Sequence, residues 1–80
     1  MNTDPAILAK RSVTIAGHST SISLEEIFWA HLTRIAGERS LSINALVTEI
    51  DSHRSGNLSS AIRVYVMQSL TVSEDPSESP

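Results

Sequence analysis

The amino-acid sequence predicts a mainly α-helical domain with a short β-ribbon, and two local patterns lead to this expectation. An alternating stretch from Thr20 to Leu24 runs directly into a helical pattern that begins near Glu25. A Leu-Ser step at Leu41 then opens a second helical pattern. A lone strand of this length is not stable in water, because its backbone donors and acceptors need a partner. No sufficient partner strand is obvious elsewhere in the chain, so we expect a homodimer with an antiparallel ribbon between the two copies.

Length and composition predict one small domain. A monomer of 80 residues buries little core and has no cysteines to cross-link it, so oligomerisation is an expected source of stability. The lack of cysteine fits a reducing compartment. No apolar run reaches the length of a membrane span, and the first residues do not have the pattern of a signal peptide. We therefore expect a soluble, cytoplasmic protein with no membrane partner.

The net charge of −3 is unevenly distributed along the chain. All six basic residues lie within residues 10–70, together with only five of the nine acidic residues, which gives this part a net charge of +1. Residues 1–9 are expected to be a flexible arm. Residues 71–80 are polar, acidic and rich in Pro and Ser, which predicts a disordered tail. The folded domain is therefore expected to span residues 10–70.

Two alternating stretches precede the first helix. Ser12 to Ile15 predicts a short strand, and residues 16–19 predict a turn because Gly17 tolerates a positive φ. Residues 11–24 are then either a hairpin whose second arm pairs across a dimer, or an extended arm followed by a single strand. In the second stretch Ile22 and Leu24 share one face. The opposite face carries Ser19, Ser21 and Ser23.

Three helices are expected after the ribbon. The first runs from about Glu25 to Arg39, with Ser23 and Glu26 at the spacing of a capping box. The second begins at Ser42, a capping residue, and ends near Arg54; the third follows Asn57 as its N-cap and packs on the dimer body. Their apolar periodicity and that of the strand predict a dimer core of Ile22, Leu24, Phe28, Leu32, Ile35, Leu46, Val47 and Ile50.

The order strand, helix, Leu-Ser turn, helix resembles the ribbon-helix-helix DNA-binding proteins of the Arc and MetJ type. The residues that carry the resemblance are Ser21-Ile22-Ser23-Leu24, Leu32 with Ile35-Ala36, Leu41-Ser42, and Leu46-Val47 with Ile50. The chain is most similar to a bacterial subgroup with an additional N-terminal strand and C-terminal helix. The corresponding segments here are Arg11 to Ile15 and Asn57 to Ala61, so that the resemblance extends over about residues 10–70.

The resemblance implies a homodimer that inserts its ribbon into the major groove of double-stranded DNA. Outward ribbon side chains meet base edges in that family, which assigns base contacts to Ser19, Ser21 and Ser23. Relatives often have a basic or long amide residue among these positions, whereas Ser19 is small and neutral. The start of the second helix clamps a phosphate in that family, and a helix N-terminus is a ready anion site. The matching residues are Ser42, Ile43 and Asn44.

Lys10 and Arg11 directly precede the first expected strand, and we expect them to reach DNA phosphates from the arm.

His18, His31 and His53 have no metal-ligand spacing. Neither a nucleophile elbow nor a Gly-rich phosphate loop is present. We therefore expect no enzyme activity, no metal and no cofactor.

Together these patterns predict a sequence-specific transcriptional regulator. The alternative is a dimeric protein-interaction module or an antitoxin of the same fold with little DNA affinity, because the ribbon face is neutral and basic residues are few. A protein partner would then bind the C-terminal helix or tail.

Overall fold

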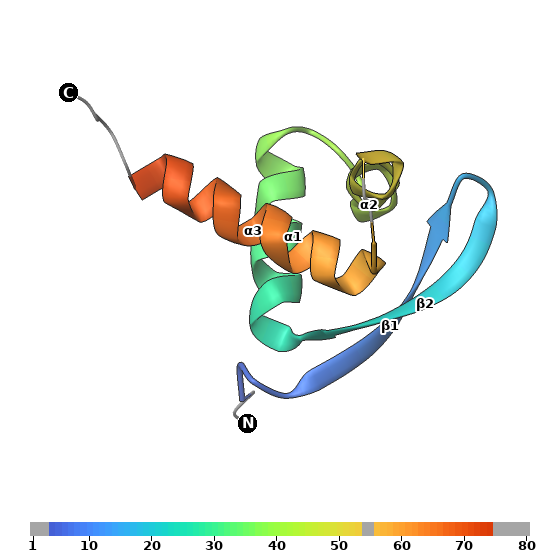
Figure 1. Ribbon diagram of the computed structural model, residues 1–80, viewed down its shortest axis with the longest axis horizontal. Coiled ribbons are helices and arrows are strands. Elements are labelled where there is room, and N and C mark those ends of the chain that lie inside the picture. Colours follow the sequence, from blue (N-terminus) through green and yellow to red (C-terminus); the bar gives the residue numbers. More distant parts are fainter. Residues whose placement is uncertain (1–3, 54–55, 75–80) are drawn as a thin grey trace.

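The computed structural model describes residues 4–53 and 56–74, in which two strands are followed by three helices (Figure 1). The strands are β1 (Leu8–Ile15) and β2 (His18–Glu25). The helices are α1 (Glu26–Glu38), α2 (Ile43–His53) and α3 (Leu58–Glu74). The expected fold class, a short β-ribbon that leads into helices, is confirmed.

Strands β1 and β2 pair with each other as an antiparallel hairpin, in a register that runs from Leu8 opposite Glu25 to Ile15 opposite His18. The expectation that the chain offers β2 no sufficient partner strand is therefore wrong. Strand β1 has eight residues and begins well before the alternating stretch at Ser12. Its first half, Leu8-Ala9-Lys10-Arg11, is not an alternation of apolar and polar residues, which is why the sequence did not reveal it.

A two-residue turn closes the hairpin. Ala16 and Gly17 both have positive φ, of 52° and 84°. Two consecutive residues of this kind form the type I′ turn, whose twist matches that of the flanking strands. The turn is shorter than the expected four residues, since His18 and Ser19 already belong to β2.

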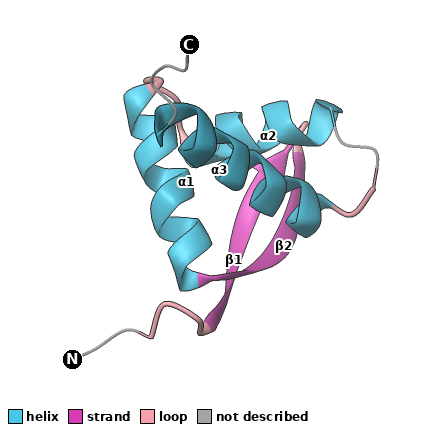
Figure 2. Ribbon diagram, turned by 60° about the vertical axis from the view of Figure 1, so that its left-hand side comes forward, coloured by secondary structure: helices cyan, strands magenta, loops and turns pink. Residues whose placement is uncertain are grey.

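The three helices lie on one side of the hairpin, and α3 crosses over α1 (Figures 1 and 2). Every element contributes to one core, which contains no buried polar or charged residue among those described. The buried side chains are Val13, Ile15, Ile22, Leu24, Trp29, Leu32, Ile35, Ala36, Leu46, Val47, Ile50, Ile62 and Val66. All the expected core residues except Phe28 are in this set, so a single chain buries them without a second copy.

Trp29 takes the central position that the periodicity assigned to Phe28. Its side chain is 2% exposed, whereas Phe28 is only half-buried at the margin of the core. The indole Nε1–H of Trp29 donates a hydrogen bond of 2.8 Å to the backbone carbonyl of Ala9 in β1. A buried indole needs such an acceptor. The hairpin therefore determines which aromatic residue of α1 turns inward.

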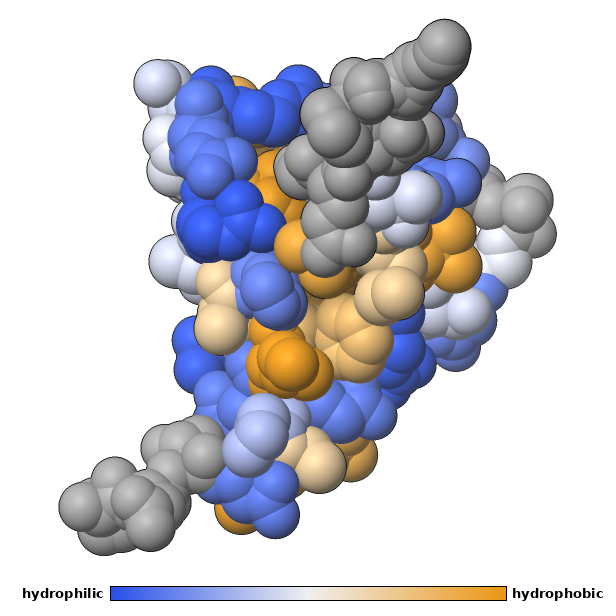
Figure 3. Space-filling view, turned by 90° about the vertical axis from the view of Figure 1, so that its left-hand side faces the viewer, coloured by the Kyte–Doolittle hydropathy of each residue, from blue (hydrophilic) through white to orange (hydrophobic). Residues whose placement is uncertain are grey.

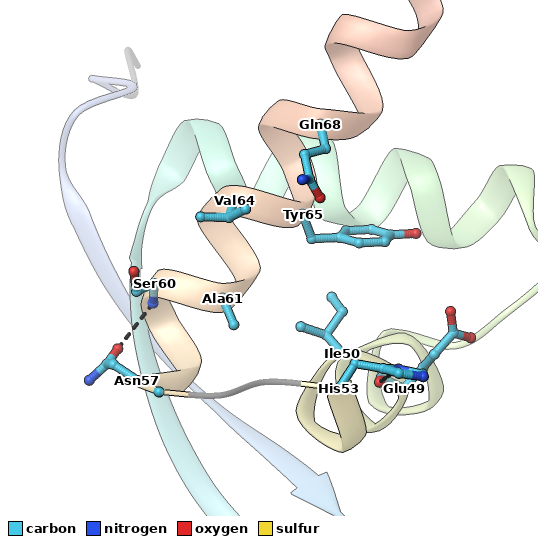
Figure 4. A pocket seen from close by; sticks show the side chains of 10 residues that line it. Glu49, Ile50, His53, Asn57, Ser60, Ala61, Val64, Tyr65 and Gln68 are labelled. Atoms are coloured by element: carbon cyan, nitrogen blue, oxygen red, sulfur yellow. Dashed lines mark hydrogen bonds between the residues drawn. The ribbon is translucent and has the colours of Figure 1, made fainter.

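The starts of α2 and α3 agree with the sequence. The Ser42 Oγ accepts the backbone N–H of Ala45 at 3.0 Å. The Asn57 Oδ1 accepts the backbone N–H of Ser60 at 3.0 Å (Figure 4). Both are the side-chain caps expected at a helix N-terminus.

The expected capping box of Ser23 and Glu26 is wrong. The N-cap of α1 is Glu25, and no side chain caps this helix start. Because β2 continues to Glu25, the Ser23 side chain lies too far ahead of the helix to reach it. Backbone carbonyls accept the first N–H groups of α1 instead: Ile7 accepts from Glu26 at 2.8 Å, and Pro5 accepts from Ile27 at 3.0 Å.

Residues 4–9, expected in the flexible arm, therefore cap α1 and begin β1. At the other end α3 continues past Leu70 to Glu74, so the first four residues of the expected tail are helical. Residues 1–3 and 75–80, as well as the expected helix end at Arg54, lie outside the described residues. Within the described part of the chain, no helix is long and apolar enough to cross a membrane.

Candidate nucleic-acid interface

The outer face of the hairpin, turned away from the helices, is rich in hydroxyl groups. Ile22 and Leu24 are buried, as the alternation predicted, and Ser19, Ser21 and Ser23 lie on the opposite face of β2. The register places Thr14 opposite Ser19, Ser12 opposite Ser21, and Lys10 opposite Ser23. Of these side chains only Ser23 is half-buried; the others are exposed. Each hydroxyl both donates and accepts hydrogen bonds, so this face can meet many polar groups.

Ser12 and Thr14 were not predicted as site residues. The signal was present, because they alternate with Val13 and Ile15, which are buried. Their position beside Ser21 and Ser19 depends on the register of the hairpin. That register is set by pairing between the strands and is not visible in either strand alone.

Lys10 and Arg11, the two expected phosphate ligands of the arm, point to opposite sides of β1. Lys10 is on the outer face and forms no ion pair with the residues that the structure describes. Arg11 is on the helix side, where its Nη2 lies 3.3 Å from the Glu26 carboxylate. Its guanidinium also lies 5.1 Å from the centroid of the Trp29 ring. The outer face of β1 therefore presents a single positive charge.

Two further arginines hold separate elements together. Arg39 makes a bidentate pair with Glu49, at 2.8 and 3.0 Å, and its Nη1 donates to the Tyr65 hydroxyl at 3.1 Å. Arg63 pairs with Glu25 at 2.9 Å. These hydrogen bonds lower the pKa of the Glu49 and Glu25 carboxyls below their ordinary value of 4.5. The charge of both arginines is thus matched inside the chain.

Arg34 is paired as well, with Glu38 one turn along α1 at 2.8 Å. The modest positive charge of the folded domain is therefore mostly neutralised locally. Contact between the outer face and a polyanion would depend on Lys10, on hydroxyl groups and on backbone N–H groups.

The start of α2 adjoins the outer face. The Asn44 Oδ1 accepts the backbone N–H of Thr14 at 3.1 Å, which fixes the helix start against the edge of β1. The backbone N–H groups of Ile43 and Asn44, in the first turn, have no acceptor among the described residues. Ser42 and Asn44 are exposed, and Ile43 is half-buried. The three expected phosphate ligands thus lie together at the positive end of a helix.

The other edge of the hairpin belongs to β2. Backbone hydrogen bonds alternate along an antiparallel pair, and the bond from Glu26 N–H to the Ile7 carbonyl continues this ladder beyond the strands. Ser19, Ser21 and Ser23 consequently turn their backbone N–H and C=O groups away from β1. We call these groups the open edge of β2.

Two further surface features lie on the helical side. A groove of about 480 Å³ between α2 and α3 is lined by Ile50, Ala61 and Tyr65, with Gln68 and His53 beside them (Figure 4). Figure 3 shows hydrophobic side chains gathered over α1 and α3. On α3, Val64 and Met67 are 52% and 53% exposed. In the described residues, no group of three or more His, Asp or Glu side chains is placed to hold a metal ion.

Comparisons with known proteins identify the architecture. The family model described as a ribbon-helix-helix domain matches residues 8–70. Among solved structures, an uncharacterized protein from Bordetella pertussis Tohama I is similar, with a TM-score of 0.79 and 22% sequence identity. The match covers 90% of this chain and 62% of that protein, so this chain spans less than two thirds of its length. No curated protein matches the chain.

Proposed function

Because the chain belongs to the ribbon-helix-helix domain family, we propose that it is a homodimeric DNA-binding protein that regulates transcription. Proteins with domains of this family are generally DNA-binding transcription regulators or antitoxins. The fold is a non-enzymatic one. The proposed partner is double-stranded DNA, and the proposal assigns the protein no catalysis and no cofactor.

The observation that carries the proposal is the junction of the outer face with the start of α2. The hydrogen bond from Thr14 to Asn44 places hydroxyl groups and free helix N–H groups side by side. In the proposed complex the outer face enters the major groove, and Ser19, Ser21 and Ser23 contact base edges. The N–H groups at the start of α2 bind a flanking phosphate, since a helix N-terminus favours an anion. Lys10 adds one phosphate contact, whereas Arg11 would first have to leave Glu26.

Hydroxyl groups discriminate weakly among base pairs because each can donate or accept. Specificity must then come from several contacts, repeated by the second copy. We propose that the two copies pair along the open edge of β2, so that two outer faces meet paired half-sites on the DNA.

The test introduces a negative charge at the start of α2. Ser42→Asp keeps a good capping side chain and brings a carboxylate to the proposed phosphate site. We expect the affinity for the protein's own promoter DNA to fall by about tenfold or more, since the like charge opposes the phosphate. Binding is measured by fluorescence anisotropy at several salt concentrations, with a scrambled duplex beside the promoter.

The matched control is Asn57→Asp, which changes the N-cap of α3 to the same residue at a start that the proposal leaves off the DNA. This variant should bind DNA within about twofold of the wild type, because both variants carry the same added charge and differ in its place. Equal losses in the two variants would remove the α2 start from the interface.

A protein-interaction module or antitoxin is the second candidate, favoured by the exposed side chains of Val64 and Met67 on α3. Clustered apolar exposure of this kind is typical of protein contacts. Under this candidate the wild type fails to bind its promoter DNA even at low salt, where phosphate contacts are strongest.

A further inference from the structure

The open edge of β2 is suited to pairing with a second copy of itself. Its side chains, those of Ser19, Ser21 and Ser23, are small and uncharged. In an antiparallel arrangement centred on Ser21, Ser19 faces Ser23 of the partner subunit and no like charges meet. Such a pair uses the outward N–H and C=O groups of all three residues.

The first turns of α3 lie against the end of this edge. The Ser59 Oγ donates a hydrogen bond to the Ser23 carbonyl at 3.4 Å. Arg63, one turn further along the same face of α3, binds the Glu25 carboxylate at 2.9 and 3.4 Å. Both side chains of this ion pair are about two-thirds buried. Ser59 and Arg63 therefore hold α3 beside the last residues of β2.

A partner strand needs the same space. In the symmetric ribbon a backbone N–H of the partner strand would lie about 2.9 Å from the Ser23 carbonyl oxygen, and the Ser59 hydroxyl already lies 3.4 Å from the same oxygen. The carbonyl of Ser23 is also one of the acceptors that symmetric pairing would use. The start of α3 and a second β2 strand consequently compete for one position.

We propose that the start of α3 gates assembly: a second copy pairs along the open edge of β2 only when Ser59 releases Ser23. The inference rests on the proposed function, because it takes the partner of the ribbon to be a second copy. The start of α3 would then regulate dimerisation, because its movement changes the fraction of dimer. A ribbon without a neighbouring α3 has no such regulation. DNA that binds the dimer then favours the released position of α3 by mass action.

The test compares two single hydroxyl deletions on adjacent residues. Ser59→Ala removes the contact with Ser23 in both copies and should lower the dissociation constant of the dimer about five- to a hundredfold, the range for two neutral hydrogen bonds. Ser60→Ala is the control, because the Ser60 hydroxyl is exposed and makes no hydrogen bond within the described part of the chain. Sedimentation equilibrium measures the dissociation constants, and circular dichroism verifies that α3 stays helical.

A third variant separates the gate from the ribbon. Ser21→Pro removes an N–H group that points away from β1, a position where a strand tolerates proline. It should abolish the dimer, alone and combined with Ser59→Ala, while the monomer stays folded. If Ser21→Pro disrupts the dimer but Ser59→Ala and Ser60→Ala have equal constants, the gate is wrong and the proposed ribbon stands. If Ser21→Pro dimerises like the wild type, ribbon pairing fails, and the gate fails with it.

Discussion

Ala16 occupies a backbone conformation that is costly for its side chain. Its φ of 52° lies in the left-handed region, and the type I′ turn requires this at both central residues. Asparagine tolerates the conformation better than alanine, and Asn-Gly is the preferred pair for such a turn. The strain is local, because the neighbouring Gly17 adopts its own positive φ freely.

Ala16→Asn should therefore stabilise the protein. We expect a gain of about 1 kcal/mol in the free energy of unfolding, the order of the left-handed penalty. Urea denaturation followed by Trp29 fluorescence measures it. The matched control is Ala30→Asn on the exposed face of α1, where the same substitution should cost about 0.5 kcal/mol through lower helix propensity. A destabilised Ala16→Asn variant would contradict the assigned turn.

At the scale of single elements, three buried side chains anchor α2 in the core. Leu46 and Val47 are fully buried, and Ile50 is nearly so. Asn44 in the first turn of α2 accepts the backbone N–H of Thr14 and so holds the helix start beside the outer face. The packing of α2 in the core therefore also fixes the position of the backbone N–H groups in its first turn.

Leu46→Ala should destabilise the protein by about 2–5 kcal/mol, the range for a truncated buried leucine. The reason is that its side chain is 0% exposed at the centre of the core. Chemical denaturation at constant temperature measures the loss. Leu8→Ala is the matched control, because Leu8 is 58% exposed and should contribute no more than about 0.5 kcal/mol. A loss below about 1 kcal/mol at Leu46 would mean that α2 is packed differently.

The sequence predicted those elements whose causes are local. The starts of α2 and α3 were predicted correctly because Ser42 and Asn57 cap N–H groups only three residues ahead. The end of α1 was placed one residue late, at Arg39 rather than Glu38. No glycine marks this end; Ser40 takes the left-handed position with a φ of 58°, and the Leu41 N–H returns to the Ala36 carbonyl at 2.8 Å.

Features that depend on distant residues were missed. The extent of β1 depends on Trp29, which binds the Ala9 carbonyl across 20 residues of sequence. The contact of Arg63 with Glu25 spans 38 residues. The outer-face serines were predicted, because alternation alone determines the face of a strand. Their neighbours Ser12 and Thr14, and the α3 residues at the open edge of β2, required the tertiary structure.

At the scale of the whole molecule, the ion pairs of Arg39 and Arg63 connect separate elements. Arg39, at the end of α1, joins α2 through Glu49 and α3 through Tyr65. Arg63 joins α3 to β2. Both pairs lower the pKa of their carboxyl group, so each adds stability above pH 4.5, the ordinary value for glutamate. That stability is lost as the pH falls below 4.5 through the lower pKa of the folded state, because the carboxylates become protonated.

Glu49→Gln should therefore lower stability at pH 7 and make it less dependent on pH in acid. The variant lacks the carboxylate that Arg39 binds, so the difference from the wild type should be largest at neutral pH and shrink steadily below pH 4.5. Urea midpoints at a series of pH values measure this difference. Glu38→Gln is the matched control, since it breaks a pair within one helix whose side chains are 43% and 62% exposed and which connects no separate elements. If both variants depart equally from the wild type at every pH, the pair of Arg39 with Glu49 does not stabilise the packing of α1 on α2.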